Sequence, residues 1–177
     1  MTTAPDLISD MPTVTVHRVE IRAVPAQDDP LAKAAFAQAR QVFGDLQRLE
    51  VARVFLIEAP LDQTTLRHVA DELLADLINQ RSTLGAQNPA PNSDVIEVHY
   101  RPGVMDPVAQ STTEAIREMI DLRGAAEVAV RTALRYDLIG TESTSDHLND
   151  FAARFLANPV IQDIHDRPYT PSRFPRG

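Results

Sequence analysis

Hydrophobic residues in this chain recur first at every second position and then at helical spacing, and this succession occurs twice. Residues 19–23 alternate apolar and polar side chains, which is the period of a half-buried strand. Val14 and Val16 have the opposite parity, so we expect a bulge or a later strand start near His17. Residues 49–57 repeat the alternation and predict a second strand.

Two helices are predicted in the same half. Asp29-Pro30 is typical of a helix start, because aspartate caps free N–H groups and proline at the first position has no N–H to lose. We expect this helix to end at Gly44. Its apolar stripe consists of Leu31, Ala35, Ala39 and Val42. The second helix begins near Asp62, and its amphipathic pattern consists of Leu66, Val69, Ala70, Leu73, Leu74 and Leu77.

The second half follows the same order. Residues 95–101 predict a strand, and Pro107 opens a helix that we expect to reach Leu122 and to be closed by Gly124. The inward positions of this helix are Val108, Ala115, Ile116, Met119 and Ile120. A long strand then places on one face Val128, Val130, Thr132, Leu134, Tyr136 and Leu138. The last helix starts near Thr144 and buries Leu148, Phe151, Ala152, Phe155 and Leu156.

The two halves can be aligned as a tandem repeat. Asp29-Pro30 falls on Asp106-Pro107, which lies 77 positions later. Leu56-Ile57 falls on Leu138-Ile139, which lies 82 positions later. One insertion of five residues between the first helix and the second strand reconciles the two separations. The alignment predicts that the halves share one fold.

Five segments follow along the chain. They are a flexible N-terminus (1–13), a first repeat (14–80), a linker (81–93), a second repeat (94–165) that ends on a short edge strand at Val160 and Ile161, and a proline-rich tail (166–177). A sheet face must be covered, and each repeat is too small to bury much core alone. We therefore expect an α+β protein in which two ferredoxin-related β-α-β-α-β repeats form a pseudo-dimer.

Composition and charge narrow the classes of function. The chain has 177 residues, a formal net charge of −8 and a pI of about 5.0, which argues against a nucleic-acid binder and against attraction to an anionic membrane. Cysteine is absent, which excludes disulfides, thiolate metal sites and cysteine nucleophiles. The N-terminus lacks the basic and apolar regions of a signal peptide, and no apolar run reaches membrane-spanning length. We expect a cytoplasmic protein.

Candidate chemical groups are few. The histidines have no paired metal-ligand spacing, and we expect His17 and His99, on the polar side of their strands, to face solvent or a partner. Arg131 and Arg135, on the polar face of the long strand, could contact a phosphate or a carboxylate, although an ion pair within the protein is the commoner role. No serine has a nucleophile-elbow context, and the glycines form no phosphate loop. We expect no catalytic residue, no metal and no cofactor.

Two motifs carry a resemblance to a known family. Pro102-Gly103-Val104-Met105-Asp106-Pro107 resembles the strand-to-helix loop of PurS, the small subunit of phosphoribosylformylglycinamidine synthase. Leu156-Ala157-Asn158-Pro159-Val160-Ile161 resembles the Leu-x-Asn-x-Val-Ile motif that occurs later in that family. The chain departs from the family pattern at Ala109 and Ala133, near which the family has glycine. The first half has Ala26 where the second has Gly103, so we expect the first loop to have lost its contact.

The resemblance implies a role and a set of partners. A PurS-type subunit would be non-catalytic and would bridge a synthetase (PurL-type) and a glutaminase (PurQ-type) subunit in de novo purine biosynthesis, supporting complex assembly and ammonia transfer. ATP, ADP, magnesium and glutamine would belong to those partners. PurS assembles as a homodimer, so the tandem chain would be a covalent pseudo-dimer, with a further homo-oligomer possible. The docking loop would consist of Arg101, Pro102, Gly103, Val104, Met105, Asp106 and Pro107, with a second motif of Asn158, Pro159, Val160 and Ile161.

One alternative belongs to another class of protein. A tandem regulatory module of the ACT type also has ferredoxin-like halves, and it binds an amino acid at a domain interface. An amino acid that raised the melting temperature of the isolated protein would favour this alternative, because a ligand that binds only the native state stabilises it. Retention of two purine-synthesis subunits on a column would favour the PurS interpretation.

Overall fold

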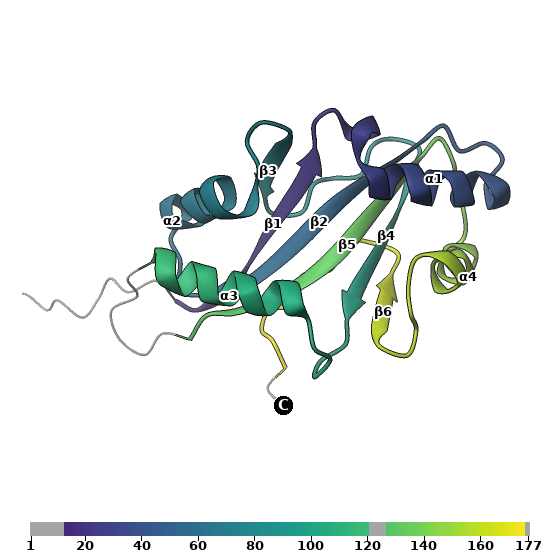
Figure 1. The fold of residues 1–177 in the computed structure, drawn as a ribbon. Helices are drawn as coiled ribbons and strands as arrows, with labels where there is room; N and C mark the ends of the chain where they lie inside the picture. The colour runs from purple at the N-terminus through teal and green to yellow at the C-terminus, as the bar shows by residue number, and fades with distance from the viewer. Residues whose placement is uncertain (1–12, 121–126, 176–177) are drawn as a thin grey trace, which may run out of the picture.

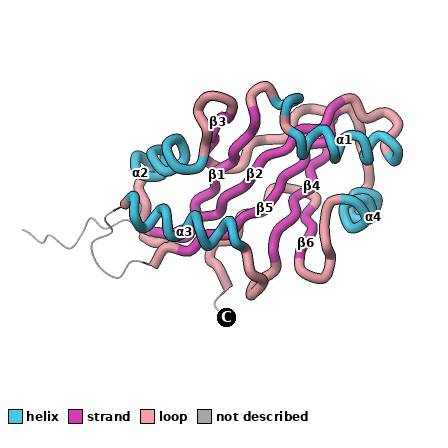
Figure 2. The backbone as a smooth tube through the Cα atoms, in the orientation of Figure 1, coloured by secondary structure: helices cyan, strands magenta, loops and turns pink. Residues whose placement is uncertain are grey.

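The computed structural model describes residues 13–120 and 127–175, and these form one antiparallel sheet with its helices on one face (Figures 1 and 2). The strand order is β3-β1-β2-β5-β4-β6. The elements are β1 (Thr15–Ala23), a 3-10 turn η1 (Ala26–Asp28), α1 (Pro30–Val42), β2 (Arg48–Ala59), α2 (Gln63–His68), its π-helical continuation η2 (Val69–Leu74), β3 (Gln80–Leu84), β4 (Ser93–Tyr100), α3 (Pro107–Met119), β5 (Ala129–Ile139), α4 (Ser145–Phe155) and β6 (Gln162–His165).

The helices begin at the capping residues that the sequence predicts. Asp29, Asp62, Asp106 and Thr144 each accept a hydrogen bond from a backbone N–H of the first turn, which satisfies a donor that the helix leaves free. At the other end, α1 ends at Val42 with Phe43 as its C-cap, not at Gly44, and Gly124 lies outside the described residues. Within the described part of the chain, no helix has the length and apolar character needed to cross a membrane.

The sheet is symmetric about its centre, where β2 pairs with β5. Glu20 of β1 lies opposite Val54 of β2, and Glu97 of β4 lies opposite Arg135 of β5. When β4 is aligned 77 positions after β1, these registers align β5 81 positions after β2, whereas the sequence alignment has 82.

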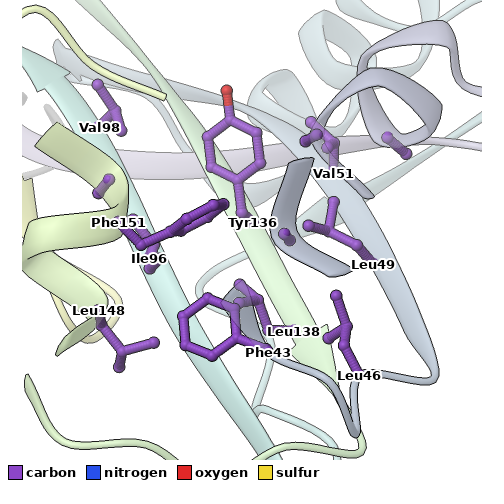
Figure 3. Packing of buried hydrophobic residues seen from close by; sticks show 14 residues of the cluster. Phe43, Leu46, Leu49, Val51, Ile96, Val98, Tyr136, Leu138, Leu148 and Phe151 are labelled. Atoms are coloured by element: carbon purple, nitrogen blue, oxygen red, sulfur yellow. The ribbon is translucent and has the colours of Figure 1, made fainter. Parts of the chain in front are cut away.

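The first helix of each half packs on the second strand of its own half and also contacts the other half of the chain. Figure 1 shows α1 beside α4 and α3 beside α2. One core cluster joins α1 and the start of β2 to β4, the end of β5 and α4. In it, the ring of Phe43 meets the ring of Phe151 edge to face at 5.1 Å between centroids (Figure 3). This packing across the boundary makes each half depend on the other for its core.

The second cluster repeats this packing from the opposite side. It joins β1, the end of β2 and α2 with η2 to α3 and the start of β5. Ala109 and Ile116 of α3 are buried here, at positions that correspond to Ala32 and Ala39 of α1. Val108, which the sequence places inward, is 54% exposed, because the buried face of α3 is rotated towards Ala109.

The opposite face of the sheet carries no helix in the described ranges and is covered by irregular chain. Phe174, in the tail, is buried against Val54, Leu56 and Ala133. Val16 packs at the edge of this cluster, and β1 pairs with β2 without the expected bulge. Val16 therefore faces the side opposite the helices, whereas Val19 and Ile21 face the helices. The proline-rich tail is therefore part of the packed structure between residues 166 and 175.

Three segments differ from the sequence expectation. The linker expected at 81–93 begins with the edge strand β3, whose mixed polar sequence gives little alternation. The edge strand expected at Val160 and Ile161 starts later, as β6 at Gln162. Leu77, expected on the buried stripe of the second helix, is 67% exposed because η2 ends at Leu74. In each case local chain reversal, rather than periodicity, fixes the boundary.

Candidate partner-docking site

A tight turn shapes the loop between β4 and α3. Strand β4 ends at Tyr100, and the Val104 N–H then donates to the Arg101 carbonyl at 3.1 Å. Proline at the second position of this turn and glycine at the third, with a φ of 83° at Gly103, are the pattern of a type II turn. A side chain at Gly103 would be strained in this conformation, so Pro102-Gly103 fixes the direction in which the loop leaves the sheet.

Asp106 joins this loop to the helix and to the neighbouring strand. Its Oδ1 caps α3 by accepting from the Ala109 N–H at 3.0 Å. Its Oδ2 accepts from the backbone N–H of Thr132 at 3.0 Å and from the Thr132 hydroxyl at 2.7 Å. Asp106 thus holds the loop against β5, and its role in folding exceeds that of a helix cap alone.

Arg101 brings the two sequence motifs together. Its N–H donates to the Ile161 carbonyl at 3.0 Å, and its Nη1 donates to the Val160 carbonyl at 3.3 Å. Its Nε donates to Asp163 at 2.8 Å in an exposed ion pair. The loop at 101–107 and the turn at 158–161 are therefore neighbours in space, which their distance in the sequence does not reveal.

The tips of both segments are apolar and exposed. Met105 and Val160 are each 77% exposed. Beside them lies an open hollow of about 360 Å³ between the loop, α3 and the start of β5, whose polar lining includes Asp106, Gln110 and Arg131. Exposed apolar tips suit contact with another protein, because they gain from being removed from water.

The two arginines proposed as anion contacts have different surroundings. Arg131 is half-buried, lies over the Phe174 ring at 4.7 Å and reaches the edge of the hollow. Arg135 is 1% exposed, and its guanidinium donates to Asp137, Glu20 and the carbonyl of Gln87. Burial and these bonds remove Arg135 from the candidate contacts and make it part of the internal structure.

A buried layer of charge lies on the sheet face opposite the helices. Glu20 is fully buried and accepts from Arg18 at 2.9 Å, from Arg135 at 3.1 Å and from Arg22 at 3.3 Å. Glu97, also fully buried, accepts from both Nη atoms of Arg18 and from the backbone N–H of Tyr169. The tail and the linker exclude water from these pairs, so each charge depends on its partners.

His99 belongs to this layer and does not face solvent as the sequence suggests. It is 7% exposed, and its Nε2 lies 2.8 Å from Glu97. Tyr169 stacks on His165 at 4.3 Å between ring centroids, and both rings meet His99 edge to face. Burial and then the nearby His99 lower the pKa of His165. The alternation of strand β4 places His99 correctly on its face, but only the tail shows that this face is covered.

Glu97 makes the protein sensitive to acid. Burial alone would raise its pKa, but the bonds from His99, Arg18 and the Tyr169 N–H outweigh it and lower the pKa from 4.5 to about 2. The unfolded chain then takes up a proton at a higher pH than the folded chain does. Stability present above pH 4.5 should be lost progressively as the pH falls towards 2. Urea unfolding across this window checks the loss, which should be smaller in Glu97→Gln.

Histidine and acidic side chains are the metal ligands that this chain, which lacks cysteine, could supply. No group of three or more histidine and acidic side chains that could hold a metal ion occurs between residues 13 and 120 or between 127 and 175. The candidate site combines a rigid turn, two apolar tips and an exposed ion pair. Sequence reasoning located both segments, but it missed their contact through Arg101.

Comparison with known proteins finds a family that is similar to the second half of the chain. The model of the PurS family, described as phosphoribosylformylglycinamidine (FGAM) synthase, matches residues 94–167. A search of curated proteins found no match. The matched segment runs from β4 to the start of the tail and contains both motifs, so it is associated with FGAM synthase and purine biosynthesis. Residues 94–167 of this chain form a PurS-like domain.

Proposed function

We propose that the protein is a non-catalytic, PurS-type subunit of phosphoribosylformylglycinamidine synthase. It bridges the synthetase and glutaminase subunits and supports the assembly of the complex and the transfer of ammonia between them. The observation that carries this proposal is the family match over residues 94–167, which includes the loop with the exposed Met105. The synthetase subunit docks on this loop and on the adjacent Val160 turn.

We further propose that the chain is a tandem duplication that acts as a covalent pseudo-dimer. The same order of elements in both halves supports this, as does the symmetric strand order about β2 and β5. The paired registers also correspond, since Ile21 lies opposite Arg53 and Val98 lies opposite Leu134. Packing of α1 and α3 across the boundary between the halves, each in an equivalent cluster, is the arrangement that a two-fold dimer would have.

Met105→Glu tests the docking surface. The side chain is 77% exposed, so the variant should melt at the temperature of the wild type. Its binding to a purified synthetase subunit should weaken about tenfold or more, because an unpaired charge would be buried at the interface. Glutamine-dependent activity of the reconstituted enzyme should fall in parallel, while activity with added ammonia, which needs no transfer from the glutaminase, should persist.

Leu31→Glu is the matched control for this experiment. Leu31 is 40% exposed at the start of α1, outside the proposed surface, and should tolerate the same charge with little effect on binding. If Met105→Glu melts normally and binds the synthetase as tightly as the wild type, the loop is only a turn and the docking proposal fails.

A further inference from the structure

The turn between η2 and β3 has a specific set of hydrogen bonds. Asp76 Oδ1 accepts from the Ile78 N–H at 3.0 Å, and the Asp76 N–H donates to Gln80 Oε1 at 2.9 Å. The backbone closes the same turn, since the Gln80 N–H donates to the Asp76 carbonyl at 2.7 Å. These bonds hold the tip of the turn, Leu77 and Ile78, away from the sheet.

The turn between α4 and β6 repeats these bonds 82 positions later. Asn158 Oδ1 accepts from the Val160 N–H at 3.1 Å, and the Asn158 N–H donates to Gln162 Oε1 at 2.8 Å. The Gln162 N–H donates to the Asn158 carbonyl at 2.9 Å. The repeated pattern includes side-chain bonds, so the correspondence goes beyond the general form of a helix-to-strand turn.

Each turn is also attached to the end of the first strand of its own half. In the first half, the Val24 N–H donates to the Asn79 carbonyl at 2.7 Å. In the second, the Arg101 N–H donates to the Ile161 carbonyl at 3.0 Å. The turn that the docking proposal uses therefore has a counterpart in the first half, although the first loop lacks the glycine and the apolar tip of the second.

The tip of the first turn is the more exposed of the two. Ile78 is 94% exposed, Leu77 is 67% exposed and Val24 beside them is 45% exposed. Arg81 is exposed next to this patch and takes part in none of the ion pairs found between described residues. The patch therefore combines three apolar side chains with one positive charge, which suits an apolar partner surface that carries a negative charge.

The charge beside the turn is reversed between the halves. Asp163 of the second half stands where the first half has Arg81, and Arg101 stands where the first half has Val24. A partner surface that complements the Arg101–Asp163 pair would therefore not complement the first turn. The two turns share an apolar anchor but select different surfaces.

We propose that Val24, Leu77, Ile78 and Arg81, termed the first-half surface, dock a second protein partner that offers an apolar pocket with a carboxylate at its rim. This inference rests on the proposed function. In that complex, the first-half surface binds the glutaminase subunit, while the Met105 loop and the Val160 turn bind the synthetase. The chain is then an adaptor with two related turns, each specific for one enzyme subunit.

The test compares Ile78→Ser with Val160→Ser in the full chain, by titration calorimetry against each purified subunit. Ile78→Ser should weaken glutaminase binding about 30-fold and leave synthetase binding unchanged, and Val160→Ser should do the reverse. Arg81→Glu should also weaken glutaminase binding and reduce its dependence on salt. All three side chains are exposed, so the melting temperatures should stay at the wild-type value.

The outcomes separate this inference from the proposed function. If the wild-type chain binds neither subunit, the proposed function fails and the inference fails with it. If the wild type binds both subunits but Ile78→Ser leaves glutaminase binding unchanged, only the inference is overturned. Loss of synthetase binding in Ile78→Ser would likewise overturn the assignment of the first-half surface.

Discussion

If the protein is divided at the linker into residues 1–89 and 90–177, neither fragment should fold as a monomer. The reason is the packing of α1 and α3 across the boundary between the halves. Helix α1 buries its apolar face partly against the start of β2, in its own fragment, and partly in a cluster with β4, the end of β5 and α4, which belong to the second fragment. Helix α3 buries its face partly against the start of β5, in its own fragment, and partly in a cluster with β1, the end of β2 and α2 with η2, which belong to the first. Each fragment alone would leave two large apolar surfaces in water.

The expected result is a fragment that is unfolded, or folded only by association. For either fragment alone, the helix and strand signals in circular dichroism should depend on protein concentration. Sedimentation should show that the folded fraction is associated rather than monomeric. An equimolar mixture should recover the spectrum of the whole chain as a one-to-one complex, because Phe43 and Phe151 and their neighbours can meet again (Figure 3). A fragment that melts cooperatively as a monomer would contradict this dependence of each half on the other.

Arg135→Met should lower the free energy of unfolding by about 3–5 kcal/mol at neutral pH, the cost of breaking a buried ion pair by removing one partner. Arg135 donates through Nη2 to Asp137 at 2.7 Å and through Nη1 to Glu20 at 3.1 Å. It also donates to the Gln87 carbonyl at 2.7 Å, which ties the linker to the sheet. Methionine fills similar space but leaves two buried carboxylates with fewer partners.

Arg131→Ala is the matched control on the same face of the same strand. Arg131 lies over the Phe174 ring at 4.7 Å, a contact that contributes about 0.5–1 kcal/mol at an exposed site. Urea unfolding of both variants and the wild type measures the difference. If Arg135→Met is no less stable than Arg131→Ala, the charged layer is not the buried network that its geometry indicates.

Much of the local structure can be predicted from the amino-acid sequence alone, because periodicity and caps act over a few residues. Asp29-Pro30 and Asp106-Pro107 mark the starts of α1 and α3, and the alternation of residues 49–57 marks β2. The motif at 102–107 also indicates the PurS family, and the model of that family matches residues 94–167. Each of these features depends on residues that are close together in the chain, so it can be recognised from the sequence.

Other properties depend on contacts between segments that are far apart in the chain. Alternation assigns Glu97 and His99 to the polar face of β4, but burial of that face depends on the tail crossing it. In the same way, the pattern of α1 predicts an apolar stripe without stating that it packs on the second half. Leu77 fits a helix-core position by spacing, yet η2 ends before it and the turn leaves it exposed. Periodicity gives the two faces of an element, whereas long-range packing decides what covers each face.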